Sequence, residues 1–171
     1  MYYKSLQMVK ISMLTLEVNI SQQTLVVFDG DNIIKSYTVS TAKNGAGEEM
    51  GSEKTPRGSH IIRAKIGANA PENAVFVGRR HTGEIYTPHM REQFPNRDWI
   101  LTRILWLSGR EPGKNRFGQV DTMRRYIYIH GTPDDVVMGV PGSRGCIRMR
   151  NRELIELFDM VQPGTSLIIK E

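Results

Sequence analysis

The stretch Leu14–Val39, LTLEVNISQQTLVVFDGDNIIKSYTV, alternates apolar with polar side chains and then contains a turn signal. Its first seven residues place apolar side chains at every second position: Leu14, Leu16, Val18 and Ile20. A period of two predicts a strand with one buried face. The apolar runs Thr24–Phe28 and Ile33–Val39 flank Asp-Gly-Asp-Asn at 29–32, which is typical of a hairpin turn. The stretch therefore predicts a β-rich fold.

Short strands are predicted along the rest of the chain as well. Four further segments have strand-like patterns: Ser59–Ile66, Trp99–Leu107, Tyr126–His130 and Ser166–Lys170. Asn151 is a plausible N-cap for a short helix, because apolar residues follow at helical spacing at 154, 157, 158 and 161. We predict one β-sandwich or barrel-like domain over residues 14–171, with one or two short helices and an N-terminal extension at 1–13.

Composition limits the classes of partner. The 171 residues carry a formal charge of +5, which favours an anionic partner. No window holds the roughly 18 apolar residues that a membrane span needs, so we expect no integral membrane segment. The N-terminus contains no legible signal peptide.

The stretch from Gly67 to Asp98 has no sustained periodicity. It contains three prolines, at positions 71, 88 and 95. A long irregular segment in a compact domain is usually functional or mobile. We therefore expect a long irregular lid there.

Chemistry concentrates around the only cysteine, Cys146. The ten residues 143–152 hold four arginines and no acid: Arg144, Arg148, Arg150 and Arg152. Positive neighbours stabilise a thiolate, so we expect a pKa below the ordinary value of about 8.5. Gly142 and Gly145 allow backbone N–H groups to converge on one point, as an oxyanion hole requires. A lone cysteine is, however, more often inert core filler.

His130 ends an apolar segment sixteen positions before Cys146. The predicted strand puts Tyr126, Tyr128 and His130 on one face. A Gly- and Pro-rich loop of this length can bring imidazole and thiol together. A lone histidine at a strand end is more often structural, but its pairing with a thiol in a basic turn favours an enzyme.

At these residues a resemblance to a known family appears. IYIHGT at 127–132 and SRGCIRM at 143–149 are similar to the catalytic signature of the L,D-transpeptidase catalytic domain, also called the YkuD domain. Four other segments resemble family segments in the expected order: Thr24–Asn44, Lys54–Ile62, Ile100–Gly109 and Leu157–Lys170. The resemblance covers nearly the whole chain, from Leu14 to Lys170.

The resemblance implies a β-rich fold and roles for individual residues. Cys146 would attack the carbonyl between an L-centre and a D-centre of a peptidoglycan stem peptide, with His130 as general base. Gly145 and Cys146 N–H groups would stabilise the oxyanion. Ser143 and Arg144 would support the loop. The residues implied in substrate binding are Gly131, Thr132, Tyr128 and Arg148.

The resemblance also implies partners and a place of action. An amine acyl acceptor would resolve the thioester, a carbapenem is the expected inhibitor, and the chemistry belongs in the cell envelope or periplasm. Arg144 departs from the family pattern, which usually has a second histidine there, and this departure bears on the choice of acceptor. Two alternatives stay open: an L,D-carboxypeptidase or other thiol hydrolase, and a non-catalytic wall- or nucleic-acid-binding homologue.

No cofactor or metal is expected. His60, His81 and His89 lack the spacing of metal ligands. The basic runs Arg79-Arg80-His81 and Arg124-Arg125 are interpreted as solvated faces, since no interleaved aromatic pattern indicates a nucleic-acid platform. We therefore expect no nucleic-acid partner.

Overall fold

The computed structural model describes residues 13–171, so nearly all of the predicted N-terminal extension lies outside the described residues. Ten strands form one sheet: β1 (Leu14–Asn19), β2 (Thr24–Asp29), β3 (Asn32–Thr38), β4 (Gly58–Ile66), β5 (Ala74–Val77), β6 (Arg80–Ile85), β7 (Ile100–Gly109), β8 (Tyr128–Gly131), β9 (Ile147–Met149) and β10 (Ser166–Lys170). The helices are α1 (Pro88–Gln93), α2 (Asn151–Met160) and a short 3-10 turn, η1 (Gly118–Val120). The prediction of a β-rich fold with one or two short helices is confirmed, and the described residues form two α-helices.

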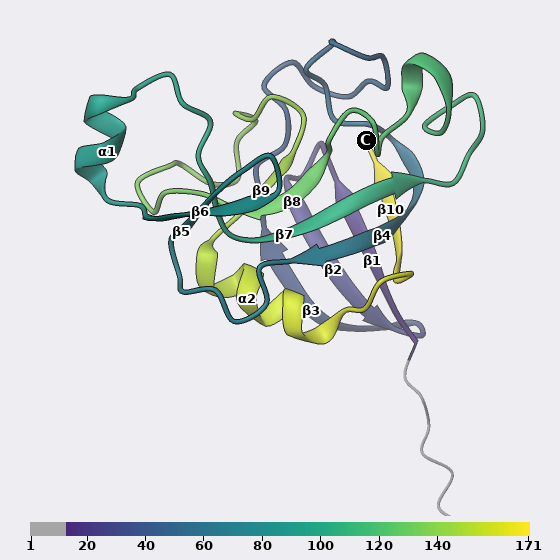
Figure 1. Ribbon diagram of the computed structural model, residues 1–171. Helices are drawn as coiled ribbons and strands as arrows, with labels where there is room; N and C mark the ends of the chain where they lie inside the picture. The colour runs from purple at the N-terminus through teal and green to yellow at the C-terminus, as the bar shows by residue number, and fades with distance from the viewer. Residues whose placement is uncertain (1–12) are drawn as a thin grey trace, which may run out of the picture.

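The sheet is mixed and strongly non-sequential. Its order is β3-β2-β1-β10-β4-β7-β5-β6, and β8 joins β7 to β9 (Figure 1). β1 pairs in parallel with β10, as does β8 with β9, and the other pairs are antiparallel. The last strand is thus inserted between the first strand and β4, so both ends of the domain lie inside one sheet.

The alternation in β1 predicts its buried face correctly. Leu16, Val18 and Ile20 are buried in the main core, and the predicted hairpin forms with Gly30 at φ +58° in a two-residue turn. α2 contacts β7 and β8 and buries Leu154 and Leu157 in the same core. Figure 1 shows this helix lying across one side of the sheet. Neither α1 nor α2, the α-helices of the described residues, is long and apolar enough to cross a membrane.

The prediction that Gly67–Asp98 is irregular is wrong, whereas its role as a lid stays a prediction. The segment contains the β5–β6 hairpin and helix α1. β5 pairs with β7, and its buried Val75 and Phe76 pack on the domain, so the hairpin is part of the sheet. The strands are short and interrupted by turns, which hides their period in the sequence.

Two predicted boundaries also shift. β8 begins at Tyr128 rather than Tyr126, because Tyr126 has φ +55°, outside the extended region that strand residues ordinarily adopt. Asn151 is the first residue of α2 and Arg150 is the N-cap. The Asn151 side chain turns into the protein instead, where it accepts from Thr102 Oγ1 at 2.7 Å and donates to Thr132 O at 3.0 Å.

The buried His60 should make the fold acid-sensitive. Its Nδ1 lies 2.9 Å from Gly58 O and its Nε2 lies 2.9 Å from Thr122 Oγ1. Burial lowers the pKa of His60 to about 4. Below about pH 6.5 the His60 imidazole therefore binds a proton in the unfolded chain but not in the folded chain. The free energy of unfolding is highest above that pH and falls by about 3 kcal/mol as the pH drops to 4. Urea unfolding of wild type and His60→Gln between pH 4 and 7 checks this, and equal pH dependence in the two proteins would contradict it.

Candidate active site

A cavity of about 400 Å³ opens beside Cys146. Four parts of the chain line it: the β5–β6 turn, the start of β7, the segment that leads into β8, and the loop before β9. Its lining residues are Gly78, Arg79, Asp98, Ile100, Arg125, Tyr126, Ile127, Tyr128, His130, Ser143, Arg144 and Cys146. This is a size that holds part of a peptide or a small ligand.

The loop that presents Cys146 is fixed by its own hydrogen bonds. The Ser143 hydroxyl donates to Cys146 O and accepts from Gly145 N–H at 3.2 Å. Buried Thr55 donates to Gly145 O at 2.9 Å, which ties the loop to the segment before β4. Gly145 has φ +130°, and a Cβ there would lie 3.1 Å from Ile127 Cδ1, so the position favours glycine.

The thiol contacts backbone groups on the strand beside it. Cys146 Sγ accepts from Tyr128 N–H at 3.3 Å and donates to Tyr126 O at 3.4 Å. Ser143 occupies the Gly145 N–H, and no described residue accepts from the Cys146 N–H. The Cys146 N–H is therefore available to donate to the oxygen of a carbonyl group whose carbon the thiol attacks.

The expectation of a low thiol pKa is contradicted. Burial raises the pKa of Cys146 to about 12, against the weaker opposite effects of Tyr128 N–H, Arg148 and Arg125. The neighbouring arginines are occupied elsewhere. The Arg144 Nη2 donates to Asn96 O at 3.2 Å, and Arg148 lies 3.4 Å from Asp98, whose own charge further raises the thiol pKa. A raised pKa favours the neutral thiol, so we expect its attack to require a base.

Alkylation of Cys146 should report this neutral thiol. Its rate with iodoacetamide is expected to keep rising beyond pH 8.5, where a free cysteine is half ionised. Adduct formation can be followed by intact-protein mass between pH 5 and 10, with free cysteine as the reference. A plateau reached at or below pH 7 would instead mean a preformed thiolate.

His130 is placed as a neutral base. It is buried in β8, and its Nδ1 lies 2.7 Å from Gly131 O. A carbonyl only accepts, so Nδ1 carries the proton and Nε2 keeps its lone pair. Burial lowers the pKa of His130, with Asp98 opposing and Arg148 adding to the effect. The structure gives His130 and Cys146 a common cavity but no direct hydrogen bond.

The other predicted site residues fall into two groups. Ser143, Arg144, Gly145 and Tyr128 lie at the cavity or in its loop. Gly131 and Thr132 are buried instead, and a Cβ on Gly131 would meet Asn151 Oδ1, so Gly131 contributes its carbonyl to His130. Arg148 is held by Asp98 and by Gly142 O at 3.0 Å. These three residues do not line the Cys146 cavity.

Sequence reasoning missed three charged residues of the cavity: Arg79, Asp98 and Arg125. Arg79 and Arg125 belong to runs interpreted as solvated faces, which is wrong for these two. Arg125 Nη2 donates to Lys54 O at 2.6 Å and its Nη1 to Gly47 O at 3.2 Å. Asp98 lies at the end of the predicted lid, and only its position on the cavity of the folded chain identifies it.

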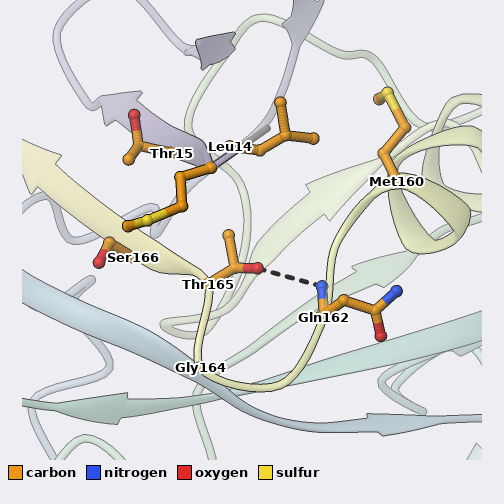
Figure 2. A pocket seen from close by; sticks show the side chains of 8 residues that line it. Leu14, Thr15, Met160, Gln162, Gly164, Thr165 and Ser166 are labelled. Atoms are coloured by element: carbon orange, nitrogen blue, oxygen red, sulfur yellow. Dashed lines mark hydrogen bonds between the residues drawn. The ribbon is translucent and has the colours of Figure 1, made fainter. Parts of the chain in front are cut away.

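Other cavities lie on the described surface as well. One of about 200 Å³ adjoins the first, shares Asp98 and Arg144 with it, and is lined by Arg91, Arg97, Thr132 and Arg148 among others. Another, of about 420 Å³, lies between the start of β1 and the end of α2 (Figure 2). Its lining contains no acidic side chain, basic side chain or thiol, and its sulfur atoms are methionine thioethers. Thr165 Oγ1 accepts from Gln162 N–H there at 3.0 Å. The chemistry therefore gathers at the Cys146 cavity.

No group of three or more His, Cys, Asp or Glu side chains within residues 13–171 is arranged to hold a metal ion. The cavity instead holds one thiol, one imidazole, one carboxylate, three guanidinium groups and the hydroxyls of Ser143, Tyr126 and Tyr128.

The sequence profile of the L,D-transpeptidase catalytic domain, YkuD, matches residues 14–169. The chain belongs to the YkuD family of L,D-transpeptidase catalytic domains. Over 152 residues it is 27% identical to the putative L,D-transpeptidase YkuD of Bacillus licheniformis, covering 89% of this chain and 62% of that protein. A 46-residue stretch is 41% identical to the Bacillus subtilis protein of the same name, covering 27% of this chain and 28% of that one.

Solved structures share the fold. An L,D-transpeptidase from Mycobacterium smegmatis superposes with a TM-score of 0.55 at 18% identity, over 94% of this chain and 59% of that one. L,D-transpeptidase 3 from Mycobacterium tuberculosis, in complex with a faropenem-derived adduct, gives a TM-score of 0.58 at 15% identity, over 94% and 61%. The YkuD-family chain described here thus spans about three fifths of the length of these relatives.

Proposed function

We propose that this YkuD-family protein is a cysteine-dependent L,D-transpeptidase that acts on peptidoglycan stem peptides through a thioester. The observation that carries the proposal is the placement of Cys146 and a neutral His130 on one cavity, with the His130 Nδ1 proton directed to Gly131 O. The Cys146 thiol is partly exposed and has a raised pKa, so its attack needs a base, and His130 is the only histidine among the residues that line the cavity.

Acylation proceeds with His130 as base and then as acid. Nε2 takes the Cys146 proton as Sγ attacks the carbonyl carbon of the L,D-peptide bond. The Cys146 N–H donates to the oxyanion. The Gly145 N–H becomes a second donor to the oxyanion when it gives up its hydrogen bond to the Ser143 hydroxyl. The tetrahedral intermediate then expels the amine of the D-residue, which takes the proton from His130. The enzyme is left as a thioester.

An amine acceptor completes the cycle. Its nitrogen attacks the thioester, His130 takes one amine proton and returns it to the leaving thiolate, and a new peptide bond forms. The two adjoining cavities support a two-substrate reaction, because Asp98 and Arg144 lie on both. Since stem peptides are part of the wall, we propose the cell envelope as the place of action.

Product analysis tests the proposal. The purified protein is incubated with a stem tetrapeptide, with and without an acceptor amine, and products are identified by mass. A transpeptidase joins the acyl donor to the acceptor with loss of the terminal D-residue. A tripeptide in equal amount under both conditions would mean an L,D-carboxypeptidase, and no product would favour a non-catalytic homologue.

A further inference from the structure

An arginine outside the predicted catalytic residues is held at the cavity by aromatic side chains. Arg79 lies in the tight turn between β5 and β6, with φ +65° after Gly78 at φ +56°. Its Nη1 donates to Tyr128 OH at 3.0 Å. Its guanidinium carbon lies 4.5 Å from the ring centroid of Tyr126 and 5.0 Å from that of Trp106. The planar group is therefore fixed in orientation while it lines the Cys146 cavity.

Arg79 has unused hydrogen-bond capacity and is held against aromatic rings, whereas Arg144, which also makes one recorded hydrogen bond, is exposed. Arg125 donates to Gly47 O, Lys54 O and Ser52 Oγ, and Asp98 is paired with Arg148. Among residues 13–171, no carboxylate lies within ion-pair distance of Arg79, and only one of its five N–H groups has a recorded acceptor. A cation with this geometry is suited to bind a carboxylate through two parallel hydrogen bonds.

Tyr128 connects this cation to the nucleophile. Its backbone N–H contacts Cys146 Sγ at 3.3 Å and its hydroxyl contacts Arg79 at 3.0 Å. The guanidinium and the thiol are thus separated by roughly one tyrosine side chain. A carboxylate bound to Arg79 would belong to the residue that supplies the attacked carbonyl or to its neighbour.

We propose that Arg79 is a specificity-determining residue that binds a carboxylate of the acyl donor close to the scissile bond. The inference rests on the proposed function for the identity of the donor. Two carboxylates have this chemistry: the C-terminal carboxylate of the leaving D-residue, and a side-chain carboxylate on the residue that provides the carbonyl. The experiment below distinguishes them.

Thiol labelling tests the carboxylate site without requiring any transpeptidase activity. Cys146 is alkylated with maleimidopropionic acid and, separately, with its neutral amide, and the ratio of the two rates is measured at one pH. Because both reagents use the same thiolate, the ratio isolates the effect of the carboxylate. A charge-assisted pair contributes enough to change it about tenfold. Arg79→Met is expected to lower the ratio by about that factor.

Arg63→Met is the matched control. Arg63 also stacks on Trp106, at 5.4 Å, but it is exposed and does not line the cavity. Its replacement should leave the ratio unchanged. Arg79→Lys keeps the charge but lacks the planar guanidinium, so its ratio of rates should lie between those of wild type and Arg79→Met. If Arg79→Met melts at a lower temperature than wild type, Arg79→Lys is compared with wild type in its place. Equal ratios in wild type and both Arg79 variants would overturn the proposal.

Stem peptides then identify the carboxylate. With a tetrapeptide donor, Arg79→Met should raise KM about tenfold with kcat within about twofold. If the effect disappears with a C-terminal amide, the leaving residue supplies the carboxylate. If it disappears when lysine replaces a carboxylated diamino acid at the third position, the side chain does. An undiminished effect with both altered peptides would overturn the proposal, whereas absence of turnover in wild type would count against the proposed function and leave the labelling result standing.

Discussion

Replacement of His130 with alanine is expected to slow acylation of Cys146 by about 10²–10⁴-fold, the usual contribution of a positioned general base. The reason is that burial keeps the thiol neutral and no other imidazole lines its cavity. Burial also lowers the pKa of His130, so the wild-type rate should persist below the ordinary histidine pKa of about 6.5 and fall only when the imidazole takes up a proton. Stopped-flow or quenched acylation rates between pH 4 and 8 measure both effects.

His81→Ala is the matched control for this substitution. His81 is exposed on β6 and lies outside the cavity, so its loss should leave the rate and its pH profile unchanged. An acylation rate in His130→Ala within about threefold of the His81→Ala rate would contradict the role of His130 as the base.

Replacement of Gly131 with alanine should damage both fold and activity. The added Cβ would lie 2.5 Å from Leu101 O and would meet the Asn151 amide, and neither is a flexible chain end. Overpacking of this kind costs about 1–3 kcal/mol. Because the Gly131 carbonyl accepts the His130 Nδ1 proton, its displacement misdirects the imidazole, and we expect acylation to fall by about 10²-fold or more. Urea unfolding and acylation kinetics measure the two losses.

Gly142→Ala provides the comparison for Gly131→Ala. A Cβ on Gly142 makes only ordinary contact, 3.6 Å from Arg148 Nη1, on the exposed loop before Cys146. Its stability should stay within about 0.5 kcal/mol of wild type. If Gly131→Ala were as stable and as active as Gly142→Ala, the carbonyl contact to His130 would not be needed.

Periodicity predicted the strands that have one buried face. The alternation in β1, the hairpin at Gly30 and the apolar pattern of α2 follow local rules, and the structure agrees with each. The hairpin of β5 and β6 was missed because its strands hold only four and six residues, interrupted by a tight turn. Asn151 matches an N-cap by type, but its amide is used by Thr102 and Thr132, which lie 49 and 19 positions away.

The candidate site shows the same division between local and long-range information. The spacing of His130 and Cys146 predicted that the two side chains come together, and both residues line one cavity. The expected thiol activation by arginines failed because charge in the sequence says nothing about where a guanidinium points. Arg144 turns to Asn96 O and Arg148 turns to Asp98, so burial dominates the thiol pKa. The stacking of Arg79 depends on Trp106, on another strand, and was equally invisible.

Acylation by a carbapenem tests the central claim, that Cys146 is the nucleophile. The strained amide carbonyl of such a compound should be attacked like the stem-peptide carbonyl. Wild type and Cys146→Ala are incubated with the compound and the intact proteins are weighed by mass spectrometry. We predict that the wild type gains the mass of one carbapenem and that Cys146→Ala gains none. An unmodified wild type, or an adduct that persists in Cys146→Ala, would contradict the account.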